Sequence, residues 1–481
     1  MEYTHIDTHW RPHIDEIVGF KLLTITEEGE KLFPGISKVQ GLTFVQSADY
    51  DVTEALAKGR VPLGIGHGKF DDHPLPGKRR KKGVCSAVLV AQELGLADSP
   101  AWANLLNYTL LNDTQGARSP FAPFELAYIP KMMYEIDKSW DHSQDSVVSW
   151  TGLAIEAILA HESKVAQGSQ AFDQQLCVVA FDRALAAWLM VKFDGKKFAT
   201  EEERAEFVFG SQELIAEQVI KRLAMAEDPW FKKILEFFRA KPETGNALFN
   251  IRSLLTLIYE RDHADGDLAI EWLFMALETK YKEQELFHEA WVEFERRVET
   301  VTVWRGKEKL TIAIMTDCDK MLMGKVARAK GMAMLIQQQP WGNVQIFSNR
   351  KLHIKAYDLA AMIRLTEQEL RGEVVTTDWR QLREEGLVPG CENWYYLLGD
   401  RKDAHMLLNG SLSVEQPPTE IPLDDLIQMA MIALDDQFFS SHSRQCLKGR
   451  CQKTVCPWYQ YGLARCRKCR KQRHRRKTNK T

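Results

Sequence analysis

Residues 8–16 read Thr-His-Trp-Arg-Pro-His-Ile-Asp-Glu, and this stretch is the starting point for predicting the fold and the function. We predict that this stretch is one short loop, on which His9, His13 and Asp15 are spaced by four and two residues, so that their side chains converge only if the chain turns. Pro12 favours such a turn. Two imidazoles with a carboxylate suit a first-row transition metal such as manganese, iron or zinc. An ordinary histidine-rich surface loop is the alternative interpretation.

A second group of candidate ligands lies in residues 64–74, which read GIGHGKFDDHP. Its glycines allow the backbone to make tight turns and to pass close to other groups. Three potential metal ligands, Asp71, Asp72 and His73, follow these glycines directly in sequence. Two adjacent carboxylates repel each other unless water solvates them or a cation holds them. The stretch is therefore either a metal site or a solvated surface turn.

Residues 1–140 alternate between strand-like and helix-like segments. Gly41–Ser47 and Val61–Gly66 are predicted strands, and Cys85–Leu96 is a predicted amphipathic helix that a glycine ends. This alternation favours an α/β fold with a largely parallel sheet and with functional sites at the strand ends. Asp113 follows a further apolar helical run and is either a third metal-ligand candidate or an ordinary cap residue.

The rest of the chain divides by composition. Helical spacing and a capping signal at Thr200 and Glu203 predict helices after residue 140, and strand-like runs return at 310–315 and 344–347 before a last helix at 423–434. The sequence therefore predicts four segments. They are an α/β domain over 1–140, a helical insert over 141–305, a smaller α/β domain over 306–438 and a tail over 439–481.

The net charge of −3 is unevenly distributed. Residues 441–481 contain 14 of the 63 Lys and Arg residues and no acid, so the rest of the chain, with all 66 acidic residues, carries about −17. An acidic body excludes general polyanion binding, whereas the tail suits it locally. With no apolar run of about 18 residues and no signal-peptide pattern, we expect no membrane span and a cytoplasmic protein.

Five of the nine cysteines lie in this basic tail with the spacing C-x4-C-x4-C-x9-C-x2-C. Clustered cysteines in a cytosolic chain indicate metal binding before disulfides, and four thiolates form a closed tetrahedral Zn²⁺ site. The favoured ligands are Cys451, Cys456, Cys466 and Cys469, with Cys446 as the substitute. A disordered tail with incidental thiols is the alternative.

The basic run that ends the tail is predicted to bind nucleic-acid phosphates rather than base edges, so binding should be salt-sensitive and largely independent of sequence. Aromatic residues between the cysteines either stack on unpaired bases or fill a small core. The predicted phosphate-binding residues are Arg465, Arg467, Lys468, Arg470, Lys471, Arg473, Arg475 and Arg476.

The order and spacing of the three amino-half motifs resemble the DHH phosphoesterase superfamily, in which residues 71–73 match the Asp-His-His motif with its middle position changed. Within it, Thr8-His9 followed by His13-x-Asp15-Glu16 is most similar to the exonuclease family named for the melanocyte proliferating gene. Residues 287–290, 343–347, 390–396 and 408–411 are similar to the second half of that family, so the resemblance covers most of residues 5–435.

The resemblance implies a two-metal, usually manganese-dependent phosphodiester hydrolase that uses metal-activated water, with a second domain of the DHHA1 type that holds the substrate. The implied metal ligands are His9, His13, Asp15, Asp71, His73 and Asp113. The implied catalytic group is Asp15, Asp71, Asp72 and His73. The implied substrate contacts are His405, Asn409, Gly410 and Ser411.

Two positions depart from the family pattern. Gly64 stands where the family has a bridging aspartate, and Asp72 stands where it has the middle histidine. Asp72 could replace the lost ligand, or Asp49 or Asp51 could reach in. Otherwise the site holds a single metal or has lost its activity.

The leading functional prediction is a nuclease, most simply an exonuclease, that acts on single-stranded RNA or DNA captured by the tail. One alternative is a phosphoesterase for small nucleotides such as cyclic dinucleotides, for which a long polycationic tail is hard to explain. The other is a nucleic-acid-binding regulatory protein with a decayed metal site, which Gly64 favours. The sequence leaves the oligomeric state open, a homo-oligomer included.

Overall fold

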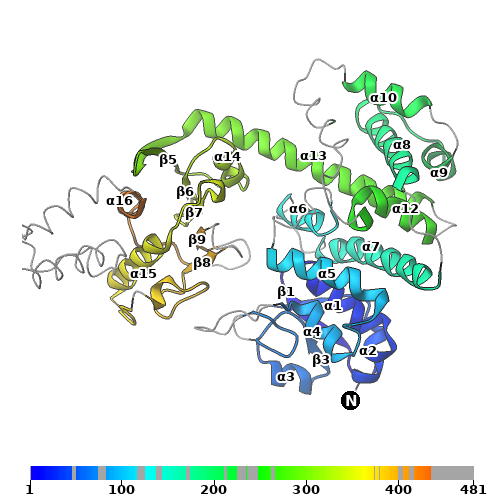
Figure 1. Cartoon of the computed structure of the whole chain (residues 1–481), viewed down its shortest axis with the longest axis horizontal. Helices are drawn as coiled ribbons and strands as arrows, with labels where there is room; N and C mark the ends of the chain where they lie inside the picture. Colours follow the sequence, from blue (N-terminus) through cyan, green and yellow to red (C-terminus); the bar gives the residue numbers. More distant parts are fainter. Residues whose placement is uncertain are drawn as a thin grey trace, which may run out of the picture. The chain divides into compact units, whose positions relative to one another are not determined.

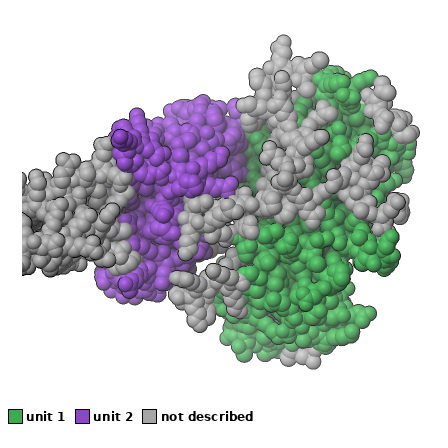
Figure 2. Space-filling model, viewed as in Figure 1, with its two compact units in different colours: residues 1–73, 80–285 green, residues 74–79, 286–481 purple. Residues whose placement is uncertain are grey.

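The computed structural model shows a mixed α/β protein (Figure 1). It describes residues 2–45, 50–73, 83–115, 125–136, 143–168, 174–210, 214–224, 235, 247–261, 266–372, 374–378, 380–398, 405–410 and 416–434. The chain divides into two compact units, of which unit 1 comprises residues 1–73 and 80–285 and unit 2 comprises residues 74–79 and 286–481 (Figure 2). The four predicted segment boundaries stay predictions.

Unit 1 is built on a three-stranded parallel sheet. Its central strand is β1 (His5–His9), with β2 (Thr43–Val45) on one side and β3 (Arg60–Pro62) on the other. A central parallel strand is covered on both faces, and accordingly residues 6–8 are fully buried. Because all three strands run in the same direction, the segments that follow β1 and β3 leave the same edge of the sheet.

Helices pack around this sheet and form the first hydrophobic core. α1 (Ile14–Ile25) lies against three of them, α4 (Ser86–Glu93), α5 (Pro100–Gln115) and α7 (Ser143–Ala166). The shorter elements of this part are α2 (Glu27–Leu32), η1 (Ile36–Lys38), α3 (Val52–Ala57) and α6 (Tyr128–Ile136).

The second part of unit 1 is helical, as predicted for this region. α12 (Ile251–Arg261) packs against α7 and α8 (Gln174–Phe193), and α8 also contacts α9 (Glu201–Phe209) and α10 (Leu214–Ala224). The indoles of Trp150 and Trp272 stack at 4.5 Å, and each donates its Nε1–H to the other's carbonyl at 2.9 Å. This reciprocal pair joins α7 to α13 (Gly266–Arg297).

Unit 2 contains a six-stranded mixed sheet in the order β4-β5-β6-β7-β9-β8, in which only the β5–β6 pair is parallel. Its strands are β4 (Glu299–Arg305), β5 (Glu308–Met315), β6 (Met334–Gln338), β7 (Val344–Ser348), β8 (Trp394–Leu398) and β9 (His405–Asn409). Its helices are α14 (Met323–Ala329), α15 (Tyr357–Arg371) and α16 (Leu423–Leu434), with η4 (Arg350–Leu352) and η5 (Gln381–Arg383). Another short helical turn, η3 (Ala247–Phe249), belongs to unit 1.

Several predicted elements are confirmed. β2 and α4 lie inside their predicted ranges, α4 is followed by Gly95 at φ +71°, and α16 has the predicted bounds. The Thr200 hydroxyl caps α9 by accepting the Glu203 N–H at 3.1 Å, but the Glu203 carboxylate accepts from the N–H of Ala199 rather than that of Thr200. Within the described ranges, no helix combines the length and the apolar character that crossing a bilayer requires.

One structural prediction was wrong. Residues 8–16 are not a single turning loop, because His9 ends β1 and Ile14 begins α1. The reversal is confined to residues 10–13, where Arg11 takes a left-handed φ of 61°. The strand was not predicted because Asp7 and Thr8 are polar residues typical of loops, although both are buried in the structure.

Candidate metal centre

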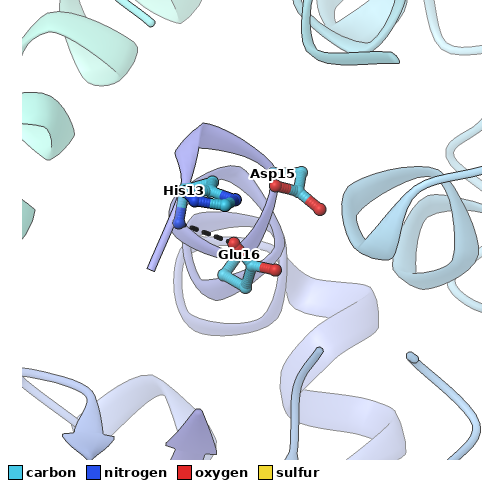
Figure 3. Close-up of side chains that lie close together, drawn as sticks. All are labelled: His13, Asp15 and Glu16. Atoms are coloured by element: carbon cyan, nitrogen blue, oxygen red, sulfur yellow. Dashed lines mark hydrogen bonds between the residues drawn. The ribbon is translucent and has the colours of Figure 1, made fainter. Parts of the chain in front are cut away.

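The turn between β1 and α1 carries the first group of candidate ligands. His9 lies at the end of the strand, His13 is the N-cap of the helix, and Asp15 and Glu16 lie in its first turn, where the helix dipole favours carboxylates. Glu16 Oε2 accepts the His13 backbone N–H at 2.7 Å (Figure 3). His13 is exposed, whereas Asp15 and Glu16 are 2% and 1% exposed. One ligand atom from each of these last three residues lies within 4.8 Å of the others.

The second group follows β3 and is organised by Asp71. Its Oδ2 accepts the His67 N–H at 2.7 Å, and its Oδ1 accepts the His73 N–H at 2.9 Å and faces His73 Nδ1 at 2.7 Å. Burial raises the pKa of Asp71, but the hydrogen bond and charge of the His73 ring, together with the backbone N–H groups of His73 and His67, outweigh it and lower the pKa overall. The same hydrogen bond raises the pKa of His73. Asp71 therefore orients His73, as carboxylates do for metal-binding histidines.

Asp113 comes from the last turn of α5 and completes the centre. Carboxylate oxygens of Asp15, Asp72 and Asp113 lie within 4.8 Å of one another. The His9 ring centroid lies 5.7 Å from that of His13 and 6.4 Å from that of His73. The structure thus brings together all six residues predicted as ligands, which come from three segments far apart in the sequence.

The surroundings of Asp15 favour the neutral carboxyl in the absence of a cation. Burial raises the pKa of Asp15 well above its ordinary value, and the carboxylates of Glu16, Asp113 and Asp72 raise it further. Asp15 Oδ1 is buried and has no hydrogen-bond partner among the residues that the structure describes. A buried carboxylate oxygen without a partner, beside imidazole nitrogens and other carboxylates, fits a divalent metal ion.

His9 and Glu16 form an ion pair within the centre. His9 Nε2 lies 3.3 Å from Glu16 Oε1, and its Nδ1 lies 2.8 Å from the Trp10 carbonyl. Burial lowers the pKa of His9, but the Glu16 carboxylate outweighs it and raises the pKa to about 9. Burial also opposes ionisation of Glu16, and the attraction of His9 lowers its pKa despite this.

This pair predicts a pH dependence for the metal-free protein. The pKa of His9 is raised from its ordinary 6.5, so its stabilising effect is complete below about pH 6.5 and is lost as pH rises through about 9. The shift corresponds to at most about 3 kcal/mol of folding free energy. In urea unfolding with a chelator present, His9→Gln should flatten the fall in stability between pH 7 and 10. The exposed neighbour His5, as His5→Gln, is the control and should keep the wild-type slope; equal slopes in all three proteins would contradict the pair.

Gly64, at a position where the family that the sequence resembles has an aspartate, faces Glu16. A Cβ at residue 64 would lie 2.8 Å from Glu16 Oε1 and 2.9 Å from its Cγ, and the backbone there has φ +70°. Residues with a side chain rarely adopt that φ. The Glu16 carboxylate is buried and held by its polar contacts, so moving it away would cost free energy. The space beside residue 64 is thus occupied by Glu16, which the sequence motif contained but which was not predicted as a ligand.

A second feature that sequence reasoning missed is the buried ion pair of Asp7. Asp7 is fully buried in β1 and accepts two hydrogen bonds from the Arg60 guanidinium at 2.6 Å and one from the Tyr50 hydroxyl at 2.6 Å. The bidentate pair fixes β1 to β3 two residues before His9. No local signal could have identified it, because Asp7 and Arg60 are 53 residues apart.

The residues predicted to contact substrate lie in unit 2. His405 is 1% exposed and its Nδ1 lies 2.6 Å from the Tyr396 hydroxyl. Asn409 is fully buried, where it donates to the carbonyls of Asn393 and Pro417. The two side chains therefore lie at opposite ends of β9 and are buried in contacts within unit 2 rather than facing solvent. Gly410 follows β9 with φ +75°, and a substrate contact at this turn stays a prediction.

The remaining predicted site residues lie outside the described part of the chain. They are Ser411, the predicted zinc ligands Cys446, Cys451, Cys456, Cys466 and Cys469, and the basic residues from Arg465 to Arg476. The candidate centre of unit 1 is therefore the part of the prediction that can be argued from geometry. Comparison of the chain with family models, with curated proteins and with solved structures finds no match in any of the three.

Proposed function

We propose that the chain is a metal-dependent phosphodiester hydrolase of the DHH type that acts on single-stranded nucleic acid as an exonuclease. The observation that carries the proposal is the convergence of three segments on Asp15, whose buried Oδ1 has no hydrogen-bond partner among the described residues. Imidazole and carboxylate ligands suit Mn²⁺ or a related divalent ion. Such ions, when bound, polarise phosphoryl oxygens and lower the pKa of water.

The residues of the centre would have different roles in holding metal ions and substrate. Ligand atoms of Asp71, Asp72 and His73 also lie within 4.8 Å of one another. Asp15 and Asp72 thus each belong to two ligand groups, so they are the residues suited to join two metal positions. His9, His13 and Glu16 would hold one side of the centre. Asp71 is a positioning residue, because its hydrogen bond to Nδ1 of His73 leaves Nε2 as that ring's ligand atom. The helix dipole at the start of α1 adds positive potential for a phosphate.

The substrate class rests on charge. Residues 441–481 contain 14 Lys and Arg residues and no acid, which suits a polymer of phosphates better than a short nucleotide. The same proposal assigns Zn²⁺ to Cys451, Cys456, Cys466 and Cys469, and a substrate-holding role of the DHHA1 type to unit 2. Gly64 favoured a decayed site, but Glu16 supplies a carboxylate beside it, which supports an active centre.

End-labelled single-stranded RNA and DNA, incubated with the full chain and Mn²⁺, should be shortened progressively, and a chelator should stop the reaction. Deletion of residues 441–481 should weaken the binding of long strands, most strongly at low salt, and leave the turnover of a dinucleotide nearly unchanged. Cleavage of dinucleotides alone would favour the small-nucleotide phosphoesterase. Tail-dependent binding without cleavage under any divalent ion would favour the regulatory protein.

A further inference from the structure

The three aspartates of the centre form a group of distinct chemistry. Asp15 lies in the first turn of α1, Asp72 in the loop after β3 and Asp113 in the last turn of α5, yet an oxygen of each lies within 4.8 Å of the other two. Asp15 and Asp72 are each 2% exposed. Every ligand atom in this group is a carboxylate oxygen, and Asp72 also belongs to a neighbouring group with Asp71 and His73, whose ligand atoms lie within 4.8 Å of one another.

The group on the other side of Asp15 differs. His13, Asp15 and Glu16 also have ligand atoms within 4.8 Å of one another, and His9 Nε2 adds a second ring nitrogen 3.3 Å from Glu16. That position therefore offers mixed nitrogen and oxygen ligands. Imidazole suits zinc, copper, iron and nickel, whereas carboxylates alone suit magnesium, calcium and manganese.

A second observation indicates that the aspartate group holds a ligand. Asp15 Oδ1 is buried and has no hydrogen-bond partner among the residues with described positions. Carboxylate oxygens of Asp72, Asp113 and Glu16 each lie within 4.8 Å of a ligand atom of Asp15, so the protein places negative charge beside this buried carboxylate. Buried polar atoms are seldom left in this state unless a water molecule or an ion satisfies them, and a carboxylate among carboxylates favours the ion.

We infer that Asp15, Asp72 and Asp113 form an all-oxygen position that selects a hard divalent cation of the Mg²⁺ or Mn²⁺ type, distinct from the histidine-bearing position beside it. The selecting residue is Asp72, because a histidine at residue 72 would place a nitrogen ligand in this group. The inference rests on the proposed metal centre but not on hydrolysis, since selectivity is a property of binding.

The test is calorimetric titration of the full chain, stripped of metal and then preloaded with two equivalents of Zn²⁺, one for the tail and one for the histidine-bearing position. Asp72→His should weaken Mg²⁺ binding roughly tenfold or more and strengthen the binding of a further Zn²⁺ by a similar factor. Asp98→His adds the same side chain at an exposed turn of the same unit and should leave both affinities at the wild-type level. Melting curves with each ion report the same preferences independently.

A second variant covers the case in which Asp72→His does not fold. Asp113→Asn removes one charge from the aspartate group without adding an imidazole, and it should abolish one Mg²⁺ site while the histidine-bearing position keeps its ion. Unchanged metal preference in folded Asp72→His, or unchanged Mg²⁺ stoichiometry in Asp113→Asn, would overturn the inference and leave the hydrolase proposal standing. Selective Mg²⁺ binding without cleavage of any substrate would support the inference and refute the hydrolase.

Discussion

Asp15→Asn is expected to make the metal-free protein more stable and the metal-loaded protein inactive. In the absence of metal, Asp15 is a buried carboxylate whose strongest charged neighbours are Glu16, Asp113 and Asp72. Neutralising it removes like-charge repulsion and the cost of burying a charge. Each unit by which burial and like charges raise the pKa of a carboxyl costs about 1.4 kcal/mol of folding free energy, so the free energy of unfolding should rise by about 1–3 kcal/mol.

The same substitution should abolish function because Asp15 belongs to both ligand groups. Losing a shared ligand removes several kcal/mol of transition-state stabilisation, which corresponds to a decrease in cleavage rate of roughly 10³-fold or more. Stability traded against activity in this way is typical of functional sites.

Urea unfolding in a chelator and melting curves with added Mn²⁺ measure the two effects separately. Wild-type protein should gain stability with Mn²⁺ in proportion to the logarithm of its concentration, and Asp15→Asn should gain almost none. Asp98→Asn changes an exposed aspartate of the same unit and should behave as wild type. If Asp15→Asn is instead less stable in the chelator, Asp15 serves the start of α1 and not a cation.

The amino-half candidate ligands could be proposed from the sequence because a metal site needs rare residue types at fixed spacings. His9, His13 and Asp15 lie within seven residues, and the Asp-Asp-His run follows a glycine-rich stretch. That these segments meet Asp113 came from the resemblance to a family, not from spacing. That oxygen atoms of Asp15, Asp72 and Asp113 lie within 4.8 Å of one another is visible only in the three-dimensional structure.

Other features depend on contacts between distant residues, for which one sequence holds no signal. The paired indoles of Trp150 and Trp272 are 122 residues apart, and the bidentate Asp7–Arg60 pair spans 53. The strand β1 was missed because two of its three buried central residues are polar, which breaks the apolar pattern that predicts strands. By contrast, α16 was predicted with its full bounds, since its apolar residues recur at helical spacing between a proline-rich segment and the tail.

Gly64→Ala is expected to be the most disruptive small substitution in the centre. Its methyl group would lie 2.8 Å from Glu16 Oε1 and 2.9 Å from Glu16 Cγ, and the φ of +70° would add strain. Strain at such a φ costs roughly 1–2 kcal/mol, and overpacking a buried site costs about 1–3 kcal/mol more. If Glu16 is displaced, its ion pair with His9 is also broken, so the affinity for Mn²⁺ should fall more than tenfold. For the same reason Gly64→Asp, which introduces the residue of the family pattern, should weaken metal binding and not improve it.

Gly95 provides the matched control for this prediction. It has nearly the same backbone conformation, φ +71°, but no atom lies within 4 Å of the position of an added Cβ. Gly95→Ala should therefore show the conformational cost alone, with unchanged metal affinity. In a double-mutant cycle, the cost of Gly64→Ala should drop toward that of Gly95→Ala once Glu16→Ala removes the obstructing carboxylate. An equal cost in both backgrounds would mean that Glu16 does not fill this space and that the centre lacks a replacement for the missing aspartate.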